Sequence, residues 1–246
     1  MDDKQIEINR YNERAQEILN TKQFQIKIPS YLNSANEYYF RSFKKFKKKI
    51  KLLEIGAGTG ENTSRILEMS FNVCATDISP KSVEAMNKKF TKYKNFSSKI
   101  ADMEKLPFKN ESFDIICSAG SLSYGDKNLV MNEIYRVLKL DGAVIFLDSL
   151  NNNPIYRFNR YLHYLKGNRS KNTIKRTPDM NLINQYIKKF GYGNVRYFGS
   201  ITWTFPLLKL ILSDNQISRL SDYIDFKINI KKFAFKIELI LSKKTL

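Results

Sequence analysis

Short apolar runs alternate with longer mixed segments along the middle of the chain, from residue 51 onward. The apolar runs predict strands, and the mixed segments predict helices. The predicted strands cover residues 52–55, 73–77, 96–101, 113–118 and 143–148, and the predicted helices cover 63–70, 80–90 and 127–138. Such an alternation favours an α/β fold, in which helices cover a mostly parallel sheet.

The flanking regions lack this rhythm. Residues 1–50 predict helices and loops with an aromatic face, which either packs on the core or forms a lid over a ligand. After residue 149 two irregular stretches are separated by a predicted helix at 182–190 and a predicted strand at 195–198. Apolar residues at alternate positions over 232–243 predict a last strand. The expected plan is one domain, 1–246, with an N-terminal helical lid (1–50), a ligand-binding core (51–148), insertions (149–182 and 199–231) and a final strand (232–246).

Composition narrows the class of protein. Apolar residues make up 42 % of the 246, enough for a core. The two cysteines, Cys74 and Cys117, lie in strand-like runs and lack the spacing of a zinc site or a disulfide framework, so we expect them to be buried and reduced. The N-terminus is not a secretory signal, and no apolar run approaches the ~20 residues that span a bilayer. These features, and an abundance of Lys, Asn, Ile and Phe, favour a cytoplasmic bacterial enzyme.

The chain carries a formal net charge of +18, from 42 Lys and Arg against 24 Asp and Glu. A positive field of this size attracts phosphates, nucleic acid or an anionic membrane surface. Six of the lysines lie within residues 44–51. Charge runs are usually solvated helix ends, so this run is read either as such an end or as an anion-attracting segment.

Glycines at alternate positions, Gly56, Gly58 and Gly60, follow the first predicted strand. Glycines at a strand-to-helix turn let the backbone approach a ligand closely. A dinucleotide site would place its last glycine at position 61, but this chain has Glu61 there, which would repel a pyrophosphate. Together with Glu54, this turn favours a nucleoside ligand that carries no phosphate, such as S-adenosylmethionine.

Two further acids stand at the ends of predicted strands. Asp77 ends the second strand and can accept hydrogen bonds from both hydroxyls of a ribose, and Asp102 follows the third. Ligands of parallel α/β sheets bind at the carboxyl ends of the strands, near the point where the strand order reverses.

The ordered set of motifs over residues 50–150 resembles the class I S-adenosylmethionine-dependent methyltransferases. The resemblance rests on Leu52 to Gly60, Ala75 to Ser79, Asp102 to Phe108, Phe113 to Ser118 and Glu133 to Gly142. It implies a Rossmann-like, seven-stranded mixed sheet with an antiparallel last strand and helices on both faces. The cofactor-binding residues that it implies are Glu54, Gly56, Ala57, Gly58, Thr59, Gly60, Asp77, Ile78, Asp102, Met103, Ser118, Ala119 and Gly120. Asp77 is expected at the ribose, Ile78 and Met103 beside the adenine, Asp102 at its amino group, and 118–120 near the sulfonium.

The acceptor side is less determined. His163, the only histidine, has a side chain suited to base catalysis, although a surface or packing role is the alternative. Tyr124 is the second candidate catalytic residue. Arginine forks bind phosphate or carboxylate, so arginines in the first insertion predict an anionic acceptor, with general basicity as the alternative. The candidate acceptor-binding residues are Tyr31, Tyr39, Arg157, Arg160, Arg169 and Arg176.

The insertion that begins Asn152-Asn153-Pro154-Ile155-Tyr156-Arg157 resembles methyltransferases of bacterial surface-polysaccharide synthesis, among them enzymes of capsular O-methyl phosphoramidate synthesis. This second resemblance implies O-methylation of a small phosphorylated or nucleotide-activated precursor. No metal site is expected, because no cluster of metal ligands occurs in the sequence.

Two other functions stay open. An RNA methyltransferase would explain the net charge, but the chain lacks the Asn-Pro-Pro-Tyr and Pro-Cys motifs of enzymes that methylate nucleic-acid bases, and no RNA-binding module is visible. A non-catalytic, cofactor-binding partner of another methyltransferase is the other alternative. Residues 201–213 form either a buried helix or lid, or a peripheral contact with a membrane. The sequence does not determine the oligomeric state.

Overall fold

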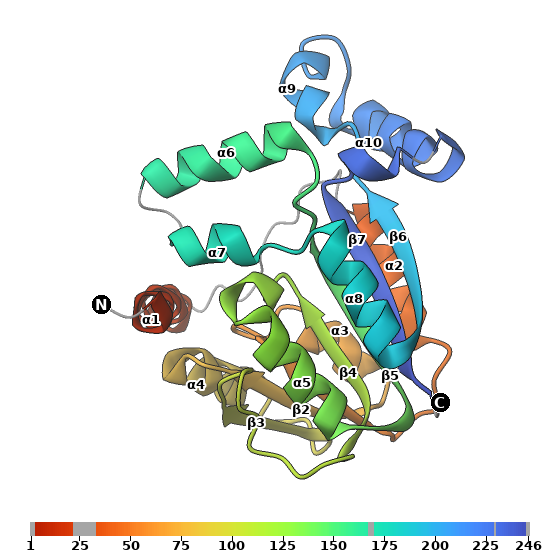
Figure 1. Ribbon diagram of the computed structural model, residues 1–246. Coiled ribbons are helices and arrows are strands. Elements are labelled where there is room, and N and C mark those ends of the chain that lie inside the picture. Colours follow the sequence, from red (N-terminus) through yellow and green to blue (C-terminus); the bar gives the residue numbers. More distant parts are fainter. Residues whose placement is uncertain (1–2, 22–32, 167–169, 229, 245–246) are drawn as a thin grey trace.

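The computed structural model describes residues 3–21, 33–166, 170–228 and 230–244 (Figure 1). Its centre is a seven-stranded sheet in the order β3-β2-β1-β4-β5-β7-β6. Strand β7 is antiparallel to both of its neighbours, and the other pairs are parallel. The predicted mixed sheet with an antiparallel last strand is therefore confirmed. The strands are β1 (Lys51–Ile55), β2 (Asn72–Asp77), β3 (Phe96–Ile100), β4 (Phe113–Ala119), β5 (Leu138–Ser149), β6 (Gly191–Phe198) and β7 (Lys236–Lys243).

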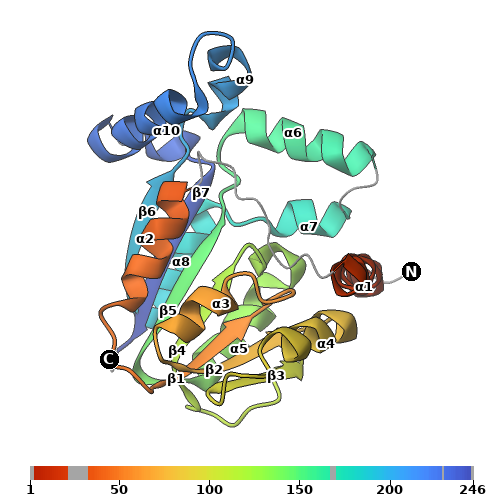
Figure 2. The same cartoon turned by 180° about the vertical axis from the view of Figure 1, so that it is seen from behind.

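Helices cover both faces of the sheet, as the alternating pattern predicts. Helices α5 (Lys127–Val137) and α8 (Met180–Phe190) pack on one face, in front in Figure 1. Helices α2 (Asn33–Phe43), α3 (Thr63–Glu68) and α4 (Pro80–Lys89) pack on the other, which Figure 2 shows from behind. Each face has its own apolar core, so the sheet lies between two hydrophobic layers and its strand ends are fixed in position.

Two strands are longer than predicted. Strand β5 begins at Leu138, because α5 ends at Val137 and the chain enters the sheet without a connecting loop. A shift of register between Phe113 and Ile115 in β4 accommodates the extra residues. Strand β6 begins directly at Gly191, whose left-handed φ of +82° ends α8. Three of its first four residues, Gly191, Gly193 and Asn194, are poor strand formers, so the sequence signal begins only later.

The last strand is shorter than predicted. A short 3₁₀ turn, η5 (Lys231–Phe233), precedes it, and β7 begins at Lys236. Apolar residues continue at alternate positions through η5 and into β7, so the sequence pattern predicts a single strand over both segments.

Short capped helices make up much of the two insertions. The first contains α6 (Pro154–Leu165) and α7 (Lys171–Arg176). The second contains the 3₁₀ turn η3 (Thr202–Thr204), α9 (Phe205–Leu208), α10 (Asp214–Tyr223) and the π-helical turn η4 (Ile224–Ile228). Asn153 accepts a hydrogen bond from the backbone of Ile155, and Pro154 follows it at the first helical position. This Asn-Pro cap is the local signal that marks α6.

The N-terminal region divides between two roles. Helix α2 contributes Tyr39, Phe40 and Phe43 to the core, whereas α1 (Asp3–Thr21) packs beside α4 (Figures 1 and 2). The six lysines of residues 44–51 are all exposed, and Cys74 and Cys117 are free thiols. Within the described ranges, no helix is both long and apolar enough to cross a membrane.

Candidate functional site

A cavity of about 830 Å³ lies where the strands β1, β2, β4 and β5 end. Its walls come from the β1–α3 turn, the ends of these strands, the 3₁₀ turn η2 (Leu122–Tyr124) and helices α1 and α2. Nine of the thirteen predicted cofactor-binding residues line it: Gly56, Ala57, Gly58, Thr59, Asp77, Ile78, Met103, Ala119 and Gly120. The carboxyl edge of the sheet is thus where the sequence placed the ligand.

The β1–α3 turn depends on its glycines. Gly56 and Gly60 have φ of +62° and +81°, a region that side chains disfavour. A Cβ on Gly56 would lie 2.5 Å from Cβ of Ser121, and one on Gly60 would collide with the ring of Phe90. Gly60 does not line the cavity; it lets the turn pack closely against α4. Asn62 is the N-cap residue of α3, and its side chain makes no capping hydrogen bond.

Asp77 is buried at the end of β2, with its carboxylate at the cavity wall. Its Oδ2 accepts from the backbone N–H of Gly58 and its Oδ1 from that of Ser79, both at 2.9 Å. Burial raises the pKa of this carboxyl group, and the two backbone hydrogen bonds oppose the rise. The carboxylate therefore has a fixed orientation before any ligand enters.

Two acidic residues near the β1–α3 turn, Glu54 and Glu61, differ in whether they line the cavity. Glu54 is 1 % exposed beneath the turn, and its Oε2 accepts from the hydroxyl of Thr63 at 2.6 Å. Burial raises its pKa to about 7, and the Thr63 hydrogen bond lowers it. Glu54 thus supports the turn without lining the cavity. Glu61 does line it, held by the hydroxyl of Thr59 at 2.9 Å, so a carboxylate stands where a pyrophosphate would lie in a dinucleotide site.

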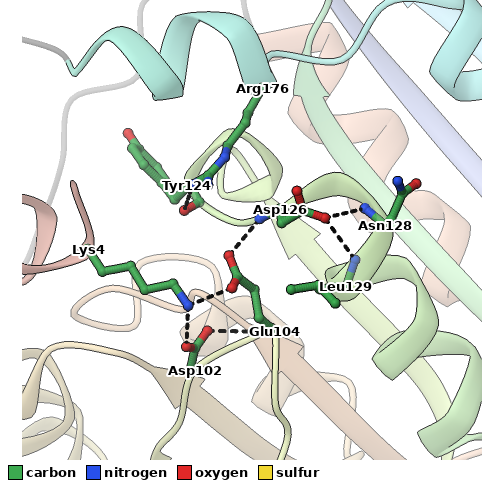
Figure 3. A network of polar contacts seen from close by, with 8 residues as sticks. All are labelled: Lys4, Asp102, Glu104, Tyr124, Asp126, Asn128, Leu129 and Arg176. Carbon is green, nitrogen blue, oxygen red and sulfur yellow. Dashed lines mark hydrogen bonds and ion pairs between the residues drawn. The ribbon is translucent and has the colours of Figure 1, made fainter. Parts of the chain in front are cut away.

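Asp102 is held by the N-terminal helix (Figure 3). The ammonium of Lys4 lies 2.6 Å from a carboxylate oxygen of Asp102 and 2.6 Å from one of Glu104. The second oxygen of Glu104 accepts from the backbone N–H of Asp126 at 2.6 Å. Asp102 therefore does not line the cavity here, whereas its neighbours Ala101 and Met103 do.

The end of β4 presents its backbone to the cavity through Ala119 and Gly120. Ser118 points away from it into the protein, where its hydroxyl shares a short hydrogen bond with that of Ser121. The Ser121 hydroxyl also donates to the carbonyl of Ile55 at 3.2 Å. These bonds tie the end of β4 to the end of β1.

Helix α1 and the η2 turn bring two tyrosines to the cavity. The rings of Tyr11 and Tyr124 meet edge to face at 5.6 Å, and both side chains line the cavity. The guanidinium of Arg10 donates to the hydroxyl of Tyr124 at 3.2 Å. Burial raises the pKa of the Tyr11 phenol, so it acts as a neutral hydrogen-bonding group.

Lys236, at the start of β7, lines the cavity at the end farthest from Asp77 in the strand order. Leu147 of β5 lies beside it, and Asn36 and Phe40 of α2 complete this wall. Burial lowers the pKa of Lys236, and the charge of Asp148 partly restores it. Within the described part of the chain, no group accepts a hydrogen bond from its ammonium group or forms an ion pair with it.

None of the predicted acceptor-binding residues that the structure describes lines the cavity. The prediction that Tyr39 binds the acceptor is wrong. Its side chain is 0 % exposed, in the apolar core on which α2 packs, where an acceptor has no access. His163 and Arg157 are exposed on α6. Arg160 is buried and donates to the carbonyl of Leu150 at 3.1 Å.

Arg176 donates to the carbonyl of Tyr124 at 3.4 Å, so it supports the η2 turn rather than facing the cavity. Tyr31 and Arg169 lie outside the described residues. Of the arginines of the first insertion that the structure describes, Arg157 is exposed, and Arg160 and Arg176 donate to backbone carbonyls.

Sequence reasoning missed Lys236 and Lys4. Lys236 stands in an alternating apolar strand, and a charged residue there was a signal that could have been used. Lys4 gave no local signal, because it meets Asp102 only through tertiary folding. No group of three or more potential metal ligands gathers among the residues that the structure describes.

Comparisons with known proteins agree with this geometry. Residues 53–146 match a family model described as a methyltransferase domain. An uncharacterized protein of Methanocaldococcus jannaschii is 30 % identical over 198 residues, which cover 71 % of this chain and 74 % of that protein. The demethylmenaquinone methyltransferase of Lactobacillus johnsonii is 35 % identical over 128 residues, 46 % of this chain and 52 % of that protein. The chain thus spans about half the length of that curated relative.

Solved structures share the fold. A chain of the complex between the Haloferax volcanii methyltransferase activator Trm112 and a methyltransferase has a TM-score of 0.65 at 13 % identity, covering 97 % of this chain and 98 % of that one. A Haemonchus contortus phosphoethanolamine N-methyltransferase, solved with S-adenosyl-L-methionine, has a TM-score of 0.61 at 18 % identity and covers 87 % of this chain and 53 % of its own.

Proposed function

Because the chain belongs to the class I S-adenosylmethionine-dependent methyltransferases, we propose that it transfers the methyl group of this cofactor to an oxygen of a small anionic acceptor. The observation that carries the acceptor class is the mostly buried ammonium of Lys236 at the far end of the cavity, whose charge Asp148 offsets only in part. Asp77, Glu61 and the Gly56–Gly60 turn lie at the other end of the cavity, which we call the cofactor half.

The residues present fit the cofactor. Any side chain at Gly56 would fill the cradle beside Ser121, and the fixed carboxylate of Asp77 suits a pair of ribose hydroxyls. In this proposal Asp77 binds the ribose, Ile78 and Met103 pack on the adenine, and the Gly56–Thr59 backbone holds the methionine end. Asp102 reaches the adenine only when Lys4 releases it.

The strand order orients the rest of the site. Asp77 ends β2, Gly56 follows β1, Ala119 ends β4, Leu147 lies on β5 and Lys236 begins β7. These strands are neighbours in that order, so the cavity runs across the edge of the sheet from Asp77 to Lys236. A cofactor that spans the first three strands leaves the β5–β7 end for the acceptor.

Lys236 gives that end a charge preference. A mostly buried ammonium without a partner in the protein is costly, and an anionic acceptor would remove that cost. The carboxylate of Asp148 is engaged by the backbone N–H groups of Leu122 and Ser149, so it only partly offsets the charge. Lys236 is therefore the residue proposed to bind the anionic group.

The chemistry requires alignment more than activation. When bound, the cofactor supplies an electrophilic methyl group, whose transfer breaks its S–CH₃ bond, forms an O–CH₃ bond and leaves neutral S-adenosylhomocysteine. The chain's part is to hold the acceptor oxygen in line and to keep water out, which Phe40, Leu147 and the α1 wall do by lining the cavity. An acceptor oxygen that is already ionised has no proton to lose.

A phosphorylated or nucleotide-activated precursor of a bacterial surface polysaccharide, such as the capsular phosphoramidate precursor, belongs to this acceptor class. The support for it is the second sequence resemblance and the charge of Lys236. The cytoplasm of a bacterium is the compartment that goes with such an acceptor.

Carbon methylation of an uncharged ring is the second candidate. It is favoured by the names of two relatives, the demethylmenaquinone methyltransferase and the sterol 4-C-methyltransferase of Caenorhabditis elegans, the latter 31 % identical over 126 residues, which cover 48 % of this chain and 37 % of that protein. Lys236 would then lack a substrate anion.

The test replaces Lys236 by Met, which keeps the length of the side chain and removes its charge. Methyl-labelled cofactor is incubated with the protein and a bacterial small-molecule extract, and the labelled product is fractionated by anion exchange. We expect label in an anion-retained product, and roughly a tenfold to hundredfold loss of kcat/KM in K236M, the cost of one charged hydrogen bond. Binding of S-adenosylhomocysteine should be unchanged.

Lys92→Met, at an exposed turn, is the matched control and should keep full turnover. Label in a neutral product, with normal turnover of K236M, would overturn the anionic acceptor and favour the second candidate. Label in RNA, in a parallel incubation with total bacterial RNA, would support an RNA methyltransferase instead. Absence of any transfer despite normal cofactor binding would contradict catalysis and favour a non-catalytic partner subunit.

A further inference from the structure

Helix α6 leaves a stripe of apolar side chains uncovered. Ile155, Phe158, Leu162 and Leu165 are 42, 62, 38 and 62 % exposed. Residues spaced three and four apart lie on one face of a helix, so these four form a continuous stripe. Tyr156 and Arg160 are buried, and they hold the helix to the insertion.

A second group of exposed apolar residues lies at the same end of the molecule. Leu207, Leu210 and Ile211, in and after α9, are 69, 81 and 83 % exposed. The hydroxyl of Tyr156 accepts from the backbone N–H of Trp203 at 3.0 Å, which ties the start of α6 to the turn before α9. Both helices stand above the sheet in Figures 1 and 2. We call these seven residues the apical surface.

Positive charge surrounds the α6 part of the apical surface. Residues 154–176 contain seven Lys and Arg and no Asp or Glu. Four of these side chains are exposed: Arg157, Lys166, Lys171 and Lys175. In the described ranges none of the four forms an ion pair.

We propose that the apical surface docks on an anionic lipid membrane, with α6 lying in the plane of the interface. An amphipathic helix with an apolar stripe and basic flanks has the chemistry of an interfacial anchor. Anionic headgroups attract exposed Lys and Arg, and the acyl boundary accepts side chains such as Phe158 and Leu210. This docking goes beyond methyl transfer and does not depend on which acceptor is used.

Two other occupants fit less well. A second copy of the chain in a two-fold interface would place the basic flank of α6 against itself, which like charges oppose. Nucleic acid would use the cations but would leave the aliphatic side chains of Leu207, Leu210 and Ile211 without a suitable contact.

The position of the apical surface also has a consequence for the cavity. Strand β5 ends at Ser149 and α6 begins at Pro154, so α6 rises from the edge of the sheet where the cavity lies. Docking would therefore bring the cavity-bearing edge toward the membrane.

Co-sedimentation of the whole chain with lipid vesicles tests the proposal. One vesicle preparation is phosphatidylcholine alone, and the other mixes it with phosphatidylglycerol in equal parts. We expect binding to the anionic vesicles, weakened about tenfold in the Phe158→Ser, Leu165→Ser double variant. Lys166→Glu with Lys171→Glu should weaken it similarly, and added salt should do the same.

The chain offers matched controls. Ile100→Ser with Leu129→Ser removes apolar side chains of similar exposure, 53 and 49 %, on β3 and α5. Lys92→Glu with Lys94→Glu reverses charges at an exposed turn. Both controls should bind like the unchanged protein. Equal binding to both vesicle types, or undiminished binding of the Phe158, Leu165 variant, would overturn the proposal. A dimer in solution that this variant dissociates would assign the surface to a second copy instead.

Discussion

Gly60 and Gly120 have almost the same backbone φ, +81° and +80°, but different surroundings. A Cβ on Gly60 would collide with the ring of Phe90, whereas a Cβ on Gly120 would meet nothing within 4 Å. The pair therefore separates the cost of a left-handed backbone from the cost of a steric clash.

We predict that Gly60→Ala lowers the free energy of unfolding by about 2–5 kcal/mol, the sum of a left-handed alanine and an overpacked contact. Gly120→Ala should cost only about 1–2 kcal/mol, because it carries the first term alone. Urea denaturation measures both. Equal losses in the two variants would contradict the packing account of Gly60.

The positions of nine cavity-lining residues were predictable because these residues follow the ends of successive strands in the chain. Gly56 and Asp77 stand at the ends of strands whose order the alternating pattern already indicates. Lys236 was not predictable in this way, since its place opposite Ser149 depends on the antiparallel pairing of β7 with β5. Tyr39 was misassigned because an aromatic residue gives the same sequence signal in a core as in a lid.

At the scale of elements, α1 forms one wall of the cavity through contacts with several neighbours. Lys4 forms ion pairs with Asp102 and Glu104, as Figure 3 shows, and the guanidinium of Arg10 donates a hydrogen bond to the hydroxyl of Tyr124. Asn12 accepts from the hydroxyl of Ser79 at 2.7 Å. These contacts are polar, so α1 is held more by side-chain bonds than by a buried apolar face.

We predict that Lys4→Ala loosens α1 without unfolding the domain. Loss of this partly exposed cation, which two carboxylates share, should lower the free energy of local opening of α1 by about 1 kcal/mol. Amide hydrogen exchange in α1 should then rise roughly fivefold. Lys88→Ala is the control, because Lys88 pairs with Glu84 inside α4 and joins no two elements. Unchanged exchange in α1, or the same rise in both variants, would be evidence against this clamp.

Elements were predictable where the pattern was periodic. The five strands predicted between residues 52 and 148 are all present. Helices α6 and α10 were missed, because they depend on caps such as Asn153 and Ser213 rather than on a core-facing period. The apolar residues of α6 do recur three and four apart, but the aromatic and basic residues between them obscured this period in the sequence.

At the scale of the molecule, one end of the sheet carries both the cavity and the insertions. The net charge of +18 is a property of the whole chain, and the sequence alone did not locate its function. Part of this charge lies on the exposed flank of α6, and four cationic residues, Arg14, Arg65, Lys89 and Lys236, line the cavity. Our main proposal is that this cavity binds S-adenosylmethionine and that Asp77 binds its ribose.

Calorimetric titration with S-adenosylhomocysteine tests that claim most directly. The unchanged protein should bind one molecule per chain, and Asp77→Asn should bind roughly a hundredfold more weakly, because two charged hydrogen bonds to the ribose are lost. Asp141→Asn, at an exposed position of β5 with φ of +57° that asparagine tolerates, should bind normally. Unchanged affinity in Asp77→Asn, with a folded protein, would contradict the account.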